Sequence, residues 1–315
     1  MRATPLASAL DQLDRVVVGK RDPLRVILAA ILAGGHVLLE DMPGVGKTLA
    51  AKALATHLDL SFSRIQFTPD MLPSDITGAM HFDQRTHEYS FRPGPLFGGL
   101  VLADEVNRAP AKTQAALLQA MAEAEVSVDG TTHALPHPFH VVATANPIEY
   151  EGTFALPEAQ LDRFLVRVSL GYPDARSEAI MVRSVARTGT ASTPVTPDGR
   201  ITIDLGEQQR RVRQVEVTDL VVDYVLRIVA ATRSHPALAL GASPRGSLAL
   251  TQCAQAWALF DGRDFVTPDD IQALAAPVLT HRLSLRPELW GSRTTARGVL
   301  QQVMDQTPAP DAVGR

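Results

Sequence analysis

The chain has 315 residues, of which 45% are hydrophobic and 20% charged, so it can bury the core of one large or two ordinary domains and is not wholly disordered. Its formal net charge of −4 and isoelectric point near 6.1 exclude the general basic surface of nucleic-acid-binding proteins, and contact with nucleic acid is not expected. The single cysteine, Cys253, excludes an internal disulfide and a cysteine-based metal site, and it fits a reducing compartment.

The amino-terminal region predicts two helices and no targeting segment. Apolar residues recur at three- and four-residue spacings over residues 6–33, and Pro23 fits the first turn of the second helix. Asp11 and Asp14 interrupt the apolar run that a signal peptide needs. The most apolar stretch, Val26 to Val37, contains glycines and is shorter than the ~20 residues that span a bilayer. We therefore expect a soluble, cytoplasmic protein without membrane insertion.

Short apolar runs alternate with helix-forming segments between residues 36 and 174. The predicted strands are HVLLE at 36–40, FSRIQF at 62–67, GLVLADE at 99–105, HVVATAN at 140–146 and VRVSLGYPD at 166–174. The helices predicted between them include 48–58 and 112–125. This alternation is typical of an α/β domain with a mainly parallel sheet, which we assign to residues 1–172.

After Pro173 the pattern becomes helical, and we assign residues 173–305 to a smaller, all-helical domain. Its predicted helices lie at about 174–187, 217–233, 244–260 and 267–283, the last with Thr267 as N-cap and Pro268 at the first helical position. The segment TGTASTPVTPDGR at 188–200 is typical of an exposed linker, and 306–315 is expected to be a flexible tail.

The strongest functional signal is DMPGVGKT at 41–48, where a strand leads into a glycine-rich turn that opens a helix. Backbone N–H groups of such a loop bind phosphate oxygens, Lys47 would reach the β- and γ-phosphates of ATP, and the Thr48 hydroxyl would bind Mg²⁺. The consensus has glycine where this chain has Asp41, which we expect to tolerate the left-handed conformation. The alternative is a glycine turn with an incidental lysine. The nucleotide-binding residues predicted here are Pro43, Gly44, Val45, Gly46, Lys47, Thr48 and Leu49.

Two acids end the apolar strand LVLADE at 100–105. With Mg²⁺ nearby, Asp104 can join the metal's coordination sphere, and Glu105 can polarise the water that attacks the γ-phosphate. Taken alone, such a pair is more often a solvated turn, but its place after the phosphate loop favours the catalytic interpretation. HVVATANP at 140–147 ends in the same way on Asn146, whose amide could orient the attacking water, sense the γ-phosphate or simply begin a turn.

Four segments together resemble the MoxR family of AAA+ ATPases: EDMPGVGKT, LADEVNRA, ATANPIEYEGTFALPEAQLDRF and GASPR. The resemblance extends from residue 16 to residue 283, and GTFALPEAQLDRF is its most specific string. It implies an AAA+ P-loop NTPase domain followed by a helical lid, with ATP bound at their junction and at a subunit boundary. In this family the first loop position is frequently Asp, as at Asp41, and Gln often stands where this chain has Ala145.

The resemblance also implies roles for two arginines. Arg163, in LDRF, matches the arginine finger that reaches the γ-phosphate held by a neighbouring subunit. Arg245, in GASPR, matches the sensor arginine of the lid, which would reach the γ-phosphate of its own subunit. The alternatives are an ion pair of Arg163 with Asp162 or Glu158, and a solvated helix face for Arg245.

An arginine finger requires a heterologous interface, and the resemblance therefore implies a ring, which we expect to be a homohexamer. It also implies chaperone-like remodelling, maturation or metal insertion in a partner protein that carries a von Willebrand factor A domain. The alternatives are a nucleic-acid motor or loader, which the acidic composition disfavours, and a non-hydrolysing nucleotide switch, which would have no use for Glu105.

The remaining signals concern surface segments and single residues. Residues 77–99 and 126–139 predict hairpins, and similar insertions in related proteins line the axial face and pore of the ring, although ordinary surface loops are the alternative. Trp257 and Trp290 are expected to pack in the core or the lid. No zinc site is expected from the histidines of this region, which lack ligand-like spacing: His81, His87, His133, His137 and His140.

Overall fold

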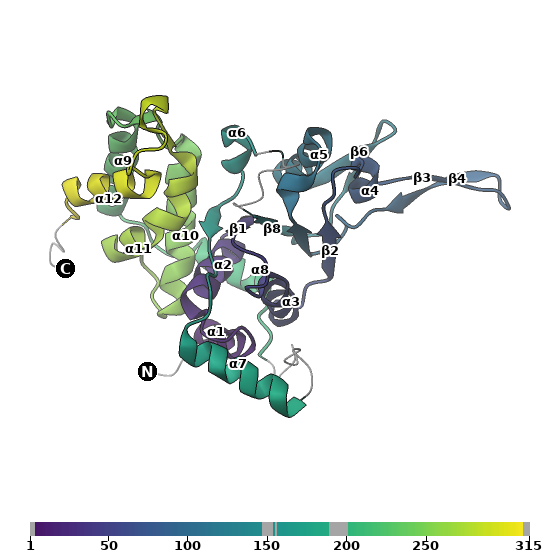
Figure 1. Cartoon of the computed structure of the whole chain (residues 1–315), viewed down its shortest axis with the longest axis horizontal. Helices are drawn as coiled ribbons and strands as arrows, with labels where there is room; N and C mark the ends of the chain where they lie inside the picture. The colour runs from purple at the N-terminus through teal and green to yellow at the C-terminus, as the bar shows by residue number, and fades with distance from the viewer. Residues whose placement is uncertain (1–3, 147–153, 155, 189–200, 311–315) are drawn as a thin grey trace.

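The computed structural model describes residues 4–146, 154, 156–188 and 201–310. A parallel sheet lies at the centre, a helical lid packs at one end, and a long hairpin extends from the other (Figure 1). No helix in these ranges is both long and apolar enough to cross a membrane.

The central sheet has five parallel strands in the order β2-β5-β8-β1-β9. Their bounds are β1 (Val37–Glu40), β2 (Phe62–Gln66), β5 (Leu100–Asp104), β8 (His140–Ala145) and β9 (Val166–Val168). Val37 at the start of β1 pairs with Val142 of β8 and with Val166 of β9. The predicted parallel α/β domain is confirmed, and all five strands end at the same edge.

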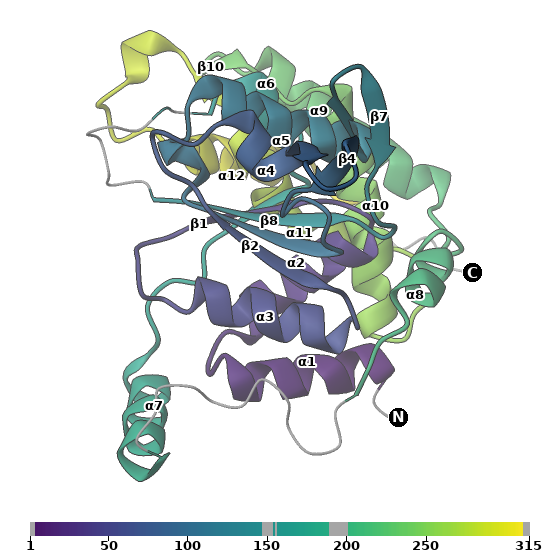
Figure 2. The same cartoon turned by 90° about the vertical axis from the view of Figure 1, so that its right-hand side faces the viewer.

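Side chains along the strands alternate between two cores, one on each face of the sheet, as the period of a pleated strand requires. Leu39 faces the larger core, while Leu38 faces the smaller one. Helices α1 (Pro5–Val16), α2 (Arg21–Leu32) and α3 (Lys47–His57) contribute to the larger core, whereas α4 (Pro73–Thr77) and α5 (Ala111–Glu123) contribute to the smaller. Figure 2 shows α1 and α3 below the sheet and α4 and α5 above it.

Both predicted hairpins are present. The pair β3 (Gly78–Asp83) and β4 (Glu88–Pro93) extends away from the sheet, and β6 (Glu125–Val128) pairs with β7 (Thr131–Ala134). The turn of the second hairpin is Asp129-Gly130, with φ of 48° and 79°. Positive φ at both central residues matches the twist of the flanking strands, which is why the Asp-Gly pair predicted this turn.

The lid contains α9 (Asp219–Ser234), α10 (Pro244–Phe260), α11 (Pro268–Leu279) and α12 (Ala296–Gln306). It is not all-helical as predicted, because β10 (Leu238–Leu240) pairs with β11 (Ser284–Leu285) in a short antiparallel ladder. Strands of two and three residues are too short to show an alternating pattern in the sequence. Thr267 begins α11 with a capping box to Asp270, which confirms the predicted N-cap.

Two other expectations about this half need correction. Trp290 is 73% exposed and does not pack in the core or the lid, whereas Trp257 packs against the larger core as predicted. The predicted tail starts too early, because Gln306 is the last residue of α12 and the side chain of Thr307 is buried. The Thr307 hydroxyl donates to the Val303 carbonyl and so continues the helix end. Residues 311–315 and most of the predicted linker at 188–200 lie outside the described residues.

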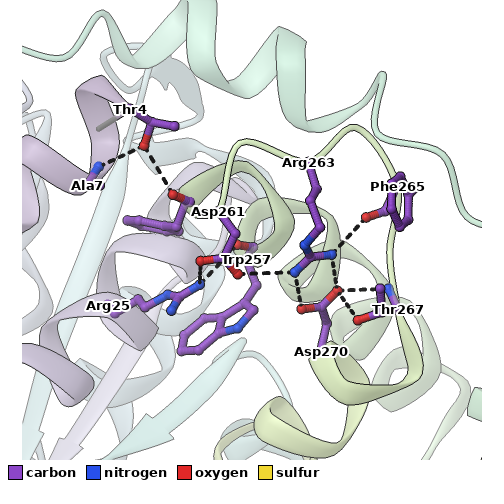
Figure 3. A network of polar contacts seen from close by, with 10 residues as sticks. Thr4, Ala7, Arg25, Trp257, Asp261, Arg263, Phe265, Thr267 and Asp270 are labelled. Atoms are coloured by element: carbon purple, nitrogen blue, oxygen red, sulfur yellow. Dashed lines mark hydrogen bonds and ion pairs between the residues drawn. The ribbon is translucent and has the colours of Figure 1, made fainter. Parts of the chain in front are cut away.

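Polar contacts fasten the lid to the first two helices (Figure 3). The Arg25 guanidinium lies 3.8 Å from the centre of the Trp257 ring and donates to Asp261 at 2.9 Å. Asp261 also pairs with Arg263 at 3.1 Å, which in turn donates to both carboxylate oxygens of Asp270. These contacts, with the packing of α10 on α2 inside the larger core, join the lid to the α/β domain.

Three buried histidines, His36, His140 and His281, have a lowered pKa and make the stability of the fold sensitive to acid. Burial lowers the pKa of His36 from 6.5 to about 4, and burial together with the neighbouring Arg282 charge lowers the pKa of His281 to about 3. The neutral His36 ring is held on both sides, since Nδ1 accepts from the Val141 N–H and Nε2 donates to the Met121 carbonyl.

Acid should therefore destabilise the fold in a defined window. Above pH 6.5 these imidazoles are neutral in both states and contribute no pH dependence. Below pH 6.5 these histidines bind protons in the unfolded chain but stay neutral in the folded state. The free energy of unfolding therefore falls as the pH is lowered to about 4, by ~3 kcal/mol for His36. Urea unfolding of wild type and His36→Asn across this pH range measures the contribution of His36 to the free energy of unfolding. If that free energy falls equally with pH in the two proteins, His36 does not make this contribution.

Candidate active site at the carboxyl edge of the sheet

The predicted catalytic segments converge on the carboxyl edge of the sheet. The phosphate loop follows β1, the acid pair Asp104 and Glu105 ends β5, and Asn146 follows β8, which lies between those two strands. The Asp41 N–H donates to the Ala145 carbonyl at 3.3 Å, which ties the loop to the end of β8. Because parallel strands end together, residues far apart in sequence meet at this edge, where open α/β sheets bind their ligands.

The phosphate loop has the backbone that its glycines predict. Gly44 and Gly46 have φ of 84° and 93°, which favour glycine, and Gly46 is the N-cap of α3 without a side chain that bonds the first turn. The N–H groups of that turn are thus free of a side-chain cap and face the direction in which an anion binds. Lys47 is buried, and its Nζ donates to the Asp41 carbonyl oxygen at 2.9 Å.

Asp41 does not adopt the left-handed conformation that the sequence suggested for it, because it is not among the described residues with positive φ. Its carboxylate turns away from the loop and accepts hydrogen bonds from Ser169 Oγ at 2.6 Å, Leu170 N at 2.6 Å and Gly171 N at 3.0 Å. The Asp41 side chain therefore has hydrogen-bond partners outside the loop, and its backbone does not adopt the conformation that favours glycine.

The acid pair lies in a network of polar side chains from three strands. The buried Asp104 carboxylate accepts from Thr144 Oγ1 at 2.7 Å and from Arg64 at 2.7 Å. Thr144 Oγ1 also accepts from the Glu105 N–H at 2.8 Å and so fixes the backbone of the second acid. Glu105 has φ of 59°, a conformation that is uncommon for a side chain of its size and is typical of functional sites.

The Glu105 carboxylate is engaged at one oxygen. Its Oε2 accepts from Gln66 Nε2 at 2.8 Å and from Arg108 at 3.0 Å. Charge-assisted contacts of this kind hold the carboxylate in place and compete for the lone pair that would accept a proton from water. Asn146 is buried at the end of β8, and its carbonyl accepts from Asn107 at 3.4 Å. The predicted residues of this edge are therefore brought together by the fold.

A cavity of about 210 Å³ lies beside the phosphate loop. It is lined by Val16 to Val18 and Lys20, by Gly44 to Gly46 of the loop, and by a wall from α7 (Ala175–Thr188). The α7 side chains at this wall are Ile180, Met181, Ser184 and Val185. The cavity is mainly apolar and opens on the loop, as a site for the base of a nucleotide would be.

Arg163 and Arg245 lie together, and the structure places them away from the phosphate loop. Both line a second cavity, of about 270 Å³, with Asp162, Leu248 and Arg282 among its other residues. Arg163 donates to the Leu118 carbonyl. The alternative ion pair with Asp162 is not formed, because Asp162 pairs with Arg282 at 2.8 Å and accepts from Ser243 at 3.0 Å.

This second cavity lies at the amino-terminal edge of the sheet. Leu165, two residues after Arg163, donates its N–H to the His36 carbonyl, just before β1 begins. The phosphate loop begins after Glu40, and at ~3.3 Å per residue β1 separates the two edges by ~13 Å. The expected role of Arg245 at the γ-phosphate of its own subunit therefore does not fit this arrangement. The reason lies in the tertiary structure, because the lid packs near the amino-terminal ends of the strands and away from the phosphate loop.

Comparison with known proteins identifies the chain. Residues 36–166 match the model of the ATPase family associated with various cellular activities (AAA), and residues 230–303 match the AAA lid domain. The chain is 48% identical to uncharacterized protein YeaC of Bacillus subtilis, over 97% of this chain and 95% of that protein. It is 40% identical to chaperone MoxR1 of Mycobacterium tuberculosis, over 97% of this chain and 82% of that protein. The chain belongs to the MoxR family of AAA+ ATPases.

A solved structure agrees with this assignment. A candidate ATPase from Cytophaga hutchinsonii, known from a 2.00 Å crystal structure, superposes on this MoxR-family ATPase with a TM-score of 0.88 and 37% identity. The alignment covers 98% of this chain and 95% of that one. Fold, lid and ATPase class are therefore shared over nearly the whole chain.

Several site residues of this MoxR-family ATPase escape sequence reasoning. Gln66 and Arg64 come from β2, and Thr144 comes from β8; each reaches the acid pair only through strand pairing. The signal that could have found Gln66 and Thr144 is their position, since a polar side chain near the carboxyl end of a strand in a parallel sheet faces the site. Arg64 lies two residues before the end of β2, and nothing in the sequence marks it.

Proposed function

We propose that this MoxR-family ATPase hydrolyses ATP with Mg²⁺ to drive chaperone-like remodelling or maturation of a partner protein. The observation that carries the proposal is the meeting of the phosphate loop, the acid pair and Asn146 at one edge of the sheet. The name of its relative MoxR1, a chaperone, supports the remodelling role. The single cysteine, buried at position 253, fits a cytoplasmic setting.

The residues at the carboxyl edge of the sheet fit the separate roles that ATP hydrolysis requires. Lys47 and the N–H groups of the first turn of α3 would bind the β- and γ-phosphates. Once its carboxylate no longer contacts Gln66 and Arg108, Glu105 would accept the proton of the attacking water. Asn146 would orient that water. Pro43 to Leu49 would contact the nucleotide.

The metal site fits Mg²⁺ in its donor set. No group of three or more His, Cys, Asp or Glu side chains able to hold a metal occurs in the described parts of the chain. Mg²⁺ in phosphoryl-transfer sites needs only one or two protein oxygens, since phosphates and water fill its other positions. Thr48 and the buried Asp104 would supply them. When bound, the ion would neutralise the charge that develops on the phosphate oxygens.

The position of the two arginines supports a ring. Arg163 and Arg245 share one cavity at the edge opposite the phosphate loop, where they would serve the site of a neighbouring subunit instead of their own. A contact in which one edge meets the opposite edge of the next copy is heterologous, and such contacts close into rings. We propose a homohexamer, with Arg163 as its arginine finger and Arg245 acting from the same subunit as Arg163.

The resemblance to MoxR proteins leads us to propose a partner with a von Willebrand factor A domain, as client or co-chaperone. We propose that this maturation includes insertion of a metal or cofactor into that partner. The hairpins β3–β4 and β6–β7 are the segments proposed to contact the partner or to line the axial face of the ring. The β3–β4 hairpin presents Phe82 and Tyr89, both exposed and with ring centroids 5.0 Å apart.

Lys47→Ala is the variant that tests nucleotide binding. Its ATP affinity should fall at least ~10-fold, because a charged donor to phosphate is worth ~1.5–3 kcal/mol and each 1.4 kcal/mol is tenfold. Isothermal titration calorimetry with ATP and Mg²⁺ measures the change. Lys52→Ala is the matched control, since Lys52 is exposed on the same helix and should bind ATP normally.

The same pair of variants tests the link to a partner. Protein purified in the presence of ATP should retain a bound partner in wild type and Lys52→Ala but not in Lys47→Ala. Unchanged ATP affinity in Lys47→Ala would remove the phosphate loop from the site. Partner retention that is independent of ATP in all three proteins would separate partner binding from nucleotide binding.

A further inference from the structure

The connector between β9 and α7, residues 169–172, is held by two charged side chains from opposite sides. On one side the Asp41 carboxylate accepts from Ser169 Oγ, Leu170 N and Gly171 N, at 2.6–3.0 Å. Asp41 is 6% exposed and belongs to the phosphate loop. Its backbone carbonyl accepts from Lys47 Nζ, so the residue that contacts the connector also contacts the loop lysine.

On the other side Lys20 reaches the same connector. Its Nζ donates to the carbonyls of Gly171 and Tyr172, both at 2.8 Å, and the residue is 5% exposed. The Lys20 backbone is fixed by its N–H, which donates to Asp14. Asp41 thus binds the N–H groups of the connector while Lys20 binds its carbonyls. Burying a carboxylate and an ammonium is costly unless each is fully hydrogen-bonded, and here the connector supplies those partners.

The connector leads into α7, whose described side chains are mostly exposed. In α7 the polar Ser177 is buried, while the apolar side chains are exposed, among them Ile180, Met181 and Val185 at 40–47%. Figures 1 and 2 both show α7 at the periphery of the molecule. Ser177 lies against Gly19, where an added Cβ would come within 2.2 Å of the Ser177 hydroxyl. The residue next to Lys20 must therefore be small for α7 to seat.

We propose that Asp41 and Lys20 are positioning residues for the nucleotide site, which clamp the connector so that α7 forms the outer wall of the cavity beside the phosphate loop. The inference rests on the proposed binding of ATP. The loop binds phosphates whether or not α7 is in place, whereas the apolar wall of α7 faces the nucleoside portion. Asp41 therefore links the two halves of the site, and glycine at this position would break the link while restoring the phosphate-loop consensus.

The test compares ATP with inorganic tripolyphosphate, which carries the phosphates without the nucleoside. Asp41→Gly and Lys20→Met should each weaken ATP binding about tenfold, the scale of one lost charge-assisted contact. Each should bind tripolyphosphate within about twofold of wild type, because the loop glycines and Lys47 are untouched. Calorimetry with Mg²⁺ gives both affinities. The double variant should show the same selective loss as the stronger single variant, since both residues hold one connector.

The controls separate this inference from the proposed function. Lys47→Ala should weaken both ligands, and Lys52→Met should weaken neither. If wild type binds neither ATP nor tripolyphosphate, the proposed function fails. If wild type binds ATP but Asp41→Gly keeps the wild-type ratio of the two affinities, or loses both ligands equally while still folded by circular dichroism, the positioning role is wrong. Should Asp41→Gly fail to fold, Ser169→Ala removes a single bond to Asp41 from an exposed residue, and the same ratio decides.

Discussion

Glu105→Gln is expected to bind ATP with wild-type affinity and to hydrolyse it at least ~10²-fold more slowly, because the amide keeps the shape of the side chain but cannot accept a proton from water. The structure fits an isosteric exchange here: the amide oxygen can still accept from Gln66 and Arg108, and Thr144 continues to fix the backbone. Steady-state release of phosphate at saturating ATP, together with ATP titration, measures turnover and binding separately.

Glu123→Gln is the matched control for that exchange. Glu123 is an exposed carboxylate on α5 that interacts with Gln119, and its loss should leave turnover unchanged. Normal hydrolysis by Glu105→Gln would show that another group activates the water. A large loss of ATP affinity would instead show that Glu105 supports the structure of the phosphate site.

Arg163→Ala should bind ATP but lose ~10³-fold or more in turnover, the scale of a missing arginine finger. The arginine lies at the edge opposite its own phosphate loop, so the defect should be repaired by another subunit. Mixing Arg163→Ala with Glu105→Gln brings together a subunit with an intact acid and one with an intact arginine. Hydrolysis should return in part in mixed rings, and wild-type activity per subunit should rise with protein concentration.

Subunit exchange must be measured in the same experiment, with fluorescently labelled protein. If the two variants exchange subunits and the mixture stays at the background of its parents, Arg163 does not act between subunits. The ring would then lose its main physical support. Arg245→Ala, mixed in the same way with Glu105→Gln, distinguishes the two possible sites of its action: rescue indicates the neighbouring subunit, and no rescue indicates its own.

The sequence predicts the parts of this site that depend on local structure. The phosphate loop and the acid pair each follow a predicted strand, so their chemistry and their position at the carboxyl edge could be inferred together. Gln66 could not be recognised in this way, because its role depends on the pairing of β2 with β5, and a lone glutamine at a strand end has no distinctive pattern.

Arg245 shows the limit of inference from a motif. The resemblance correctly marks GASPR as part of the lid, but the edge of the sheet that the lid covers is set by packing between α10 and α2. Asp41 shows a second limit. Local reasoning treated it as a substitute for glycine in the backbone, while its carboxylate binds residues more than a hundred positions away.

The contacts in Figure 3 bear on how such a molecule could do mechanical work. Arg25 and Thr4 anchor the lid to α1 and α2 through Trp257, Asp261 and the Phe260 carbonyl, and both parts share one hydrophobic core. A hinge between them would have to break this core, so the subunit should turn as a single rigid lever. In the proposed ring, strain from ATP turnover would then not be relieved by bending within a subunit. It would accumulate at the interfaces between neighbouring subunits, and a rotation there would displace the far end of the β3–β4 hairpin.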